Sequence, residues 1–151
     1  MRGLGALLGY GSILVYLINP AWIAWAQVEL AENVRWAGAA LALFMKPLLF
    51  WMFRSLGKNI TPTVSIREEH DFVHDGPYRY IRHPLYTFAS IFFVGMALLT
   101  AMPLSLLGLV VAMSALVART AQEEQKLVER FGNPYRDYMQ RTGRFFPKLS
   151  V

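Results

Sequence analysis

Two long stretches without a charged residue constrain the fold of this chain more than any other feature. The first covers residues 3–28, and the second covers the 35 residues 84–118. A helix of about 20 apolar residues crosses the ~30 Å hydrocarbon core of a bilayer. The second stretch is therefore too long for one crossing, and Pro103 divides it into halves of about 16 residues that each rise only ~24 Å. We expect a helical hairpin here, with a tight turn at residues 101–104.

These stretches, together with the apolar segment before Arg54, predict an all-α integral membrane protein of one domain. About four transmembrane helices are expected, at residues 4–26, 34–53, 86–101 and 104–118, with the third and fourth forming the short hairpin. Asn19-Pro20 interrupts the first span, which is therefore either one kinked helix or a shorter helix followed by a helix in the membrane interface. A cleaved signal peptide is the rival interpretation, because Arg2 precedes the first apolar stretch. Lys46 is about two turns from Arg54, so we expect its side chain to reach the interface.

The basic residues give an expected orientation. Charged residues make up 17% of the chain, compared with ~25% in soluble domains. If the chain crosses the membrane four times, thirteen of the fifteen Lys and Arg residues lie on one side, with both termini, the loop 54–83 and the tail 119–151. The positive-inside rule places that side in the cytoplasm, and a bacterial inner membrane is the expected location. Basic residues that flank apolar segments favour anionic lipid over nucleic acid as their partner.

The loop before the second apolar stretch is the strongest candidate for a site. Residues 76–86 hold two Arg, one His, three Tyr and two Pro. A polar, aromatic loop at the mouth of a membrane span indicates either a ligand site or an interfacial anchor made of Arg and Tyr side chains.

The three histidines stand at positions 70, 74 and 83, and this spacing matches no compact metal motif, so no metal is expected. The chain has no cysteine, which excludes a thiolate nucleophile.

Beyond the second apolar stretch, the last span is expected to continue as a helix out of the bilayer. Gly132, just before Asn133-Pro134, suits the C-terminal cap of that helix. Arg119 and Glu123 are four residues apart, so they share one helix face. They form either an exposed ion pair of little energetic worth or a polar pair that faces a site where the span leaves the membrane.

Several motifs, taken in order, resemble one family of membrane enzymes. They are His70-Asp71-Phe72-Val73, Gly76-Pro77-Tyr78, Arg82-His83-Pro84-Leu85-Tyr86, Glu123-Glu124, Phe131-Gly132 and Phe146-Pro147. This set resembles the isoprenylcysteine carboxyl methyltransferase family, and phospholipid N-methyltransferases share much of the pattern. The resemblance covers roughly residues 34–147. One departure is Thr63, which stands where the better-known eukaryotic members have Gln.

The resemblance implies an enzyme that uses S-adenosylmethionine (SAM). The positions that match the cofactor pocket of the family are His70, Asp71, Phe72, Val73, Tyr78, His83, Pro84, Leu85, Tyr86 and Glu124. Arg119 and Glu123 are implied to face the methyl acceptor. Aromatic faces can stack on adenine or attract a sulfonium. Methylation of a carboxylate would suit Arg119 as counter-charge, whereas methylation of an amine would use Glu123.

Other functional classes remain open at the level of sequence. A non-catalytic membrane scaffold or sensor could keep the same fold, and SAM binding would separate it from an enzyme. A small transporter is less favoured, because the chain shows no inverted repeat. The expected partners are membrane lipids and a lipidic or small-molecule acceptor, without nucleic acid and with a homodimer possible.

Overall fold

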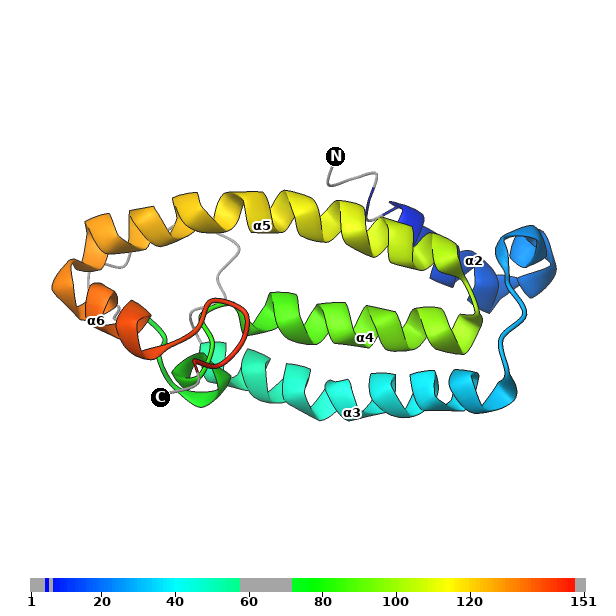
Figure 1. Ribbon diagram of the computed structural model, residues 1–151, viewed down its shortest axis with the longest axis horizontal. Helices are drawn as coiled ribbons and strands as arrows, with labels where there is room; N and C mark the ends of the chain where they lie inside the picture. Colours follow the sequence, from blue (N-terminus) through cyan, green and yellow to red (C-terminus); the bar gives the residue numbers. More distant parts are fainter. Residues whose placement is uncertain (1–4, 6, 58–71, 149–151) are drawn as a thin grey trace.

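The computed structural model describes residue 5 and residues 7–57 and 72–148 (Figure 1). The secondary structure of these residues is helical apart from one isolated bridge, which confirms the predicted all-α class. The long helices are α3 (Glu32–Leu56), α4 (Pro84–Thr100) and α5 (Pro103–Phe131). The shorter elements are the π-helix η1 (Leu7–Gly11), α2 (Ser12–Ile18), the 3-10 helices η2 (Pro20–Ala26) and η4 (Gly76–Arg79), and α6 (Asn133–Arg141).

The three long helices lie side by side, with α4 between α3 and α5 (Figure 1). The N-terminal elements η1 and α2 pack along α5 near the α4–α5 turn. At the opposite end, α5 extends beyond the start of α4 and is followed by α6. The chain after α6, red in Figure 1, returns to the start of α4. This return brings the C-terminal segment against the loop that the sequence marks as a candidate site.

Two helices, α3 and α5, are long and apolar enough to cross a membrane. The helix Leu7–Ile18 and α4 are apolar but shorter, and the 17 residues of α4 rise about 26 Å. The four crossings therefore remain a prediction. The continuation of the last span is confirmed, because α5 ends at Phe131 and Gly132 follows with a positive φ of 63°.

The N-terminal stretch is interrupted where its sequence predicts. α2 ends at Ile18, Asn19 is extended, and Pro20 begins a 3-10 helix. The side chain of Asn19 accepts a hydrogen bond from the backbone N–H of Ala21 at 3.0 Å. The span expected at residues 4–26 is therefore not one continuous helix, because Pro20 offers no N–H to the preceding turn and disfavours helical geometry at Asn19. Of the two alternatives, the structure has a shorter helix followed by a separate helical segment.

The predicted hairpin turn is confirmed at the α4–α5 connection. Ala101 is left-handed, with φ 54°, and Pro103 begins α5. Two side chains from outside the hairpin satisfy carbonyls that α4 leaves at its C-terminal end. Gln27, after η2, donates to the carbonyl of Thr100, and Arg35 of α3 donates to that of Leu99, both at 3.1 Å. The turn is thus held from outside as well as by its own backbone.

Close contact between α3 and α4 depends on two glycines. A Cβ at Gly95 would lie 2.8 Å from both the backbone N of Ala42 and the carbonyl O of Gly38. A Cβ at Gly38 would lie 2.7 Å from the carbonyl O of Gly95. Neither contact is possible for a real side chain, so the two backbones can approach only because both positions lack a Cβ. Small residues serve membrane helix pairs in the same way.

We expect Gly95→Ala to destabilise the protein by about 1–3 kcal/mol, because the added methyl forces α3 and α4 apart. Thermal unfolding in detergent measures the change. Gly11→Ala is the matched control, because a Cβ there meets only the side chain of Leu7 at 3.9 Å. A parent-like melting temperature for Gly95→Ala, with Gly11→Ala also unchanged, would show that the helices adjust freely.

Candidate functional site

The segment after α6, residues 142–148, folds over the start of α4; we call it the C-terminal strap. The backbone N–H groups of Arg82 and His83 donate to the carbonyls of Gly143 and Arg144, at 2.9 and 3.0 Å. The carbonyl of Phe145 accepts from the hydroxyl of Thr87 at 2.7 Å. These bonds fix the side chains of Arg144 and Phe145 beside the Arg-His-Pro motif.

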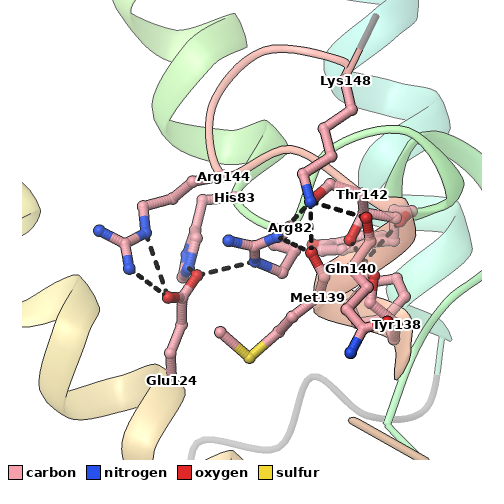
Figure 2. A network of polar contacts seen from close by, with 10 residues as sticks. Arg82, His83, Glu124, Tyr138, Met139, Gln140, Thr142, Arg144 and Lys148 are labelled. Carbon is pink, nitrogen blue, oxygen red and sulfur yellow. Dashed lines mark hydrogen bonds and ion pairs between the residues drawn. The ribbon is translucent and has the colours of Figure 1, made fainter. Parts of the chain in front are cut away.

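A buried carboxylate lies at the centre of this region (Figure 2). Glu124, on α5, is only 2% exposed. Its Oε1 is 2.8 Å from Nε of Arg82, and its Oε2 accepts from Nε of Arg144 at 3.1 Å. Arg82 also donates to the carbonyls of Met139, at 3.1 Å, and Thr142. Glu124 and Arg82 therefore join α5, the 76–83 loop, the end of α6 and the strap in one polar network.

The network determines the protonation of its members. Burial by itself raises the pKa of Glu124, but the hydrogen bonds from Arg144 and Arg82 outweigh it and hold this pKa below its usual value. Burial lowers the pKa of His83, and the nearby Glu124 only partly opposes this effect. Glu124 is therefore ionised and His83 is a neutral imidazole at neutral pH.

Next to the network, the rings of His83, Tyr86 and Phe145 form an aromatic surface. The ring of His83 stacks on Tyr86 with centroids 5.3 Å apart, and Phe145 of the strap lies 5.8 Å from His83. Nε2 of His83 is buried, 3.4 Å from Oε1 of Glu124, and has no hydrogen-bond partner in the described structure. The hydroxyl of Tyr86 donates to Oε2 of Glu123 at 3.3 Å. The surface thus offers aromatic faces and one unpaired ring nitrogen.

A second aromatic cluster lies near α6. The ring of Phe72 packs against Phe131, Tyr135 and Tyr138, with centroids 5.1 to 5.4 Å apart. The hydroxyl of Tyr138 donates to the carbonyl of Tyr78 at 2.7 Å. Burial raises the pKa of Tyr78 to about 12, so its phenol stays protonated. Beside this cluster is a cavity of about 570 Å³, whose charged or titratable lining residues are His74, Asp75, Arg79, Asp137, Tyr138 and Arg141.

The predicted site residues are therefore divided between the two clusters. His83, Tyr86, Glu123 and Glu124 come together at the network. Phe72 and Tyr78 lie by α6, where Val73 is half-buried. Pro84 is buried at the first turn of α4, and Leu85 is exposed next to it. His70 and Asp71 lie outside the described residues.

Arg119 and Glu123 do not form the ion pair that their spacing allows. The ion pairs of the described residues join Glu124 to Arg82 and to Arg144, and neither involves Arg119 or Glu123. Glu123 is half-buried and bonded to Tyr86, whereas Arg119 is exposed. The simple surface pair is therefore wrong, and the carboxylate of Glu123 faces the aromatic surface.

Sequence reasoning missed three residues of the site: Arg82, Arg144 and Phe145. Arg82 belongs to the Arg-His-Pro motif, and Arg144 and Phe145 directly precede Phe146-Pro147. An Arg before a histidine, and an Arg-Phe pair in a basic tail, look like surface anchors until the chain folds back. Only the position of buried Glu124 indicates that both guanidinium groups point inwards.

An apolar cavity of about 270 Å³ begins at the same aromatic surface. It lies among η1, α4 and α5, and Tyr86 lines it as well as the polar site. Its walls are Gly5, Gly9 and Tyr10 at the N-terminus, Leu85, Tyr86, Ala89 and Phe93 on α4, and Gly108, Leu109, Ala112, Met113 and Leu116 on α5. A polar site and an apolar cavity therefore share one side chain. Among the described residues, no three His, Cys, Asp or Glu side chains gather in a way that could hold a metal.

The sequence pattern of the isoprenylcysteine carboxyl methyltransferase (ICMT) family matches residues 38–129. The chain belongs to this family. It is 30% identical over 122 residues to a protein-S-isoprenylcysteine O-methyltransferase of Dictyostelium discoideum, covering 78% of this chain and 52% of that protein. It is 32% identical over 88 residues to the nickel-cobalt-cadmium resistance protein NccN of Alcaligenes xylosoxydans xylosoxydans, covering 58% of this chain and 41% of that protein.

The fold is also that of a solved ICMT-family structure. The eukaryotic intramembrane Ras methyltransferase ICMT superposes with a TM-score of 0.68 at 21% identity, over 96% of this chain and 51% of that one. The chain thus spans about half the length of the relatives it matches. The family pattern covers α4, most of α5, Arg82 and Glu124, and it ends at residue 129, before Arg144 and the strap.

We expect Glu124→Gln to cost about 3 kcal/mol of stability, because Arg82 loses its buried counter-charge while Arg144, which is 44% exposed, can still reach water. Because the pKa of Glu124 is depressed, its stabilisation is complete above the usual carboxyl pKa of about 4.3 and is lost as the pH falls through the lower folded-state value. Chemical unfolding at pH 7 and in acid measures both effects. Glu129→Gln, at an exposed position on the same helix, is the control. A parent-like stability of Glu124→Gln at pH 7 would contradict this role.

Proposed function

We propose that this ICMT-family chain is a membrane-embedded methyltransferase that uses SAM and methylates a lipidic acceptor. The observation that carries the proposal is that Tyr86 belongs at once to a polar, aromatic site and to an apolar cavity between helices. A water-soluble cofactor and a membrane lipid can meet only at such a boundary. The curated Dictyostelium relative is an O-methyltransferase by name, which agrees with this chemistry.

The residues of the site fit SAM. When bound, SAM supplies an electrophilic methyl group on a positively charged sulfonium. Nε2 of His83 is a buried ring nitrogen without a hydrogen-bond partner, and it would meet a polar edge of adenine or ribose. The faces of Tyr86 and Phe145 suit stacking and attraction of a cation. The negative charge of Glu123 adds to this attraction.

The network around Glu124 supports the site rather than contacting the acceptor. With Arg82 and Arg144 as partners, the carboxylate of Glu124 holds the strap, and the strap places Phe145 over His83 and Tyr86. A site covered by the strap in this way would exclude water from the reacting groups. Methyl transfer needs no covalent link to the protein, so positioning in a dry site can supply most of the rate increase.

The acceptor headgroup would lie where the apolar cavity meets the polar site. Leu116 lines the cavity, and Arg119 and Glu123 are one and two turns further along α5. An exposed Arg119 can meet a carboxylate at the membrane surface, and Glu123 can hold or deprotonate an amine. In this arrangement we place both termini in the cytoplasm of a four-span protein in the bacterial inner membrane.

We expect His83→Ala to weaken SAM binding by about 1–3 kcal/mol, because the variant loses a directional contact in a buried site. Calorimetry in detergent measures the affinity. His74→Ala is the control, since His74 is exposed. SAM binding by the parent and by His83→Ala with equal affinity would mean that the loop is only an interfacial anchor. No binding by the parent at millimolar SAM would instead favour a non-catalytic scaffold or sensor.

A pair of conservative variants separates the two acceptor classes. Arg119→Lys keeps the charge but loses the planar fork that holds a carboxylate, so it should reduce methylation of a carboxylate at least tenfold with SAM binding unchanged. Glu123→Gln should be the more damaging change for an amine acceptor. Membranes incubated with methyl-labelled SAM give the turnover of each variant. If both variants turn over like the parent, the acceptor does not meet this part of α5.

A further inference from the structure

The apolar cavity ends at an aromatic pair from two separate elements. Tyr10 of η1 and Phe93 of α4 meet edge to face, with ring centroids 4.6 Å apart and planes at 90°. Both line the cavity. Phe93 is buried, whereas Tyr10 is 63% exposed on the outer surface. The pair therefore stands between the cavity and the surface of the helix bundle.

The helices show that this pair is at the far end from the polar site. Tyr86 and Phe93 are seven residues apart on α4, which is about 10 Å along the axis. On α5, Leu116 lies near the level of Tyr86, and Leu109 near that of Phe93, because the two helices run antiparallel from the turn at Ala101. The cavity thus extends along the helices from Tyr86 to the aromatic pair.

Next to the pair, the backbone of the N-terminal segment is in direct contact with the backbone of α5. A Cβ at Gly108 would lie 2.3 Å from the backbone N of Gly9, and a Cβ at Gly5 would lie 2.7 Å from that of Ala112. The N-terminal segment therefore rests directly on the backbone of α5. Tyr10 follows Gly9 in the chain, so this contact holds its ring in place against Phe93.

We propose that the Tyr10–Phe93 pair sets the length of apolar chain that the acceptor site takes, an inference that rests on the proposed function. The cavity has about 270 Å³, and a methylene group takes about the volume of one water molecule, ~30 Å³, so roughly nine chain carbons fit. The ligand class is a carboxylate or amine on a single slender apolar chain. Its headgroup lies toward Glu123, and its chain runs along Tyr86 and Ala89 to the pair. Carbons beyond the ninth have to leave the cavity.

Photolabelling tests this length limit without needing turnover. The probes are unbranched carboxylic acids and amines of 8, 12 and 16 carbons that carry a diazirine at the end of the chain. Mass spectrometry measures the label on the cavity residues Leu109 and Met113. The label on Phe44, an exposed residue of α3, is the reference, and the result is the ratio of the two. This ratio removes differences in how the probes partition into detergent.

In the parent, the 8-carbon probe should label the cavity at least fivefold more than the 12- and 16-carbon probes. Phe93→Ala removes one ring of the pair, so the 12-carbon probe should reach the 8-carbon level of the parent. Ala89→Phe fills the cavity nearer the site and should abolish labelling by the 8-carbon probe. Phe88→Ala is the matched control, because Phe88 is another aromatic residue of α4 and does not line this cavity. Phe93→Leu replaces Phe93→Ala if that variant melts below the working temperature.

Equal cavity labelling at all chain lengths, no cavity labelling by the 8-carbon probe, or an unchanged length profile in the Phe93 variant would each overturn the inference. Failure of the proposed function has a different signature, namely the absence of SAM binding and of methyl transfer. If the protein binds SAM and methylates an acceptor, but probes of all chain lengths label the cavity equally, the proposed function stands and the role of the Tyr10–Phe93 pair in chain length is wrong.

Discussion

The buried carboxylate of Glu124 is the interaction on which the site depends. A carboxylate that is 2% exposed needs partners, because burial of an unpaired charge costs several kcal/mol. Here the partners come from Arg82 before α4 and Arg144 in the strap (Figure 2). The negative charge of Glu124 is neutralised only when the loop with Arg82 and the strap with Arg144 both lie against α5. Glu124 therefore couples the position of α5 to that of the loop and the strap. These ion pairs also hold the Glu124 carboxylate beside the neutral imidazole of His83, with Oε1 3.4 Å from Nε2.

One face of α4 passes through two different environments along its length. At its first turn, His83 and Tyr86 face the strap and Glu123. One and two turns further, Ala89 and Phe93 face an apolar cavity. A helix that passes from the polar end of the bundle into its apolar middle joins the polar, aromatic site to the apolar cavity. Tyr86 is amphipathic and suits the boundary between them.

Glycines let neighbouring helices of this chain come into backbone contact. Gly38 and Gly95 let α3 and α4 touch through their backbones, and Gly9 and Gly108 do the same for η1 and α5. Membrane helices gain little from burying apolar side chains against each other, because lipid is as apolar as the helix interior. Backbone contact and van der Waals packing must supply the association instead. The cavity persists between these contacts, where Phe93 and Tyr10 meet.

The sequence by itself determined what depends on near neighbours in the chain. The apolar stretches, Pro20 and Pro103 fix the helix limits, and Gly132 ends α5, because hydrophobic length, a missing N–H and a positive φ are local properties. The order of the motifs also indicated the ICMT family.

The partners of Glu124 were decided only by tertiary structure. Arg82 and Arg144 lie 42 and 20 residues away, and nothing local distinguishes an inward guanidinium from one that rests on lipid. The separation of Arg119 from Glu123 has the same origin, since helical spacing allows an ion pair but Tyr86, from another helix, binds Glu123.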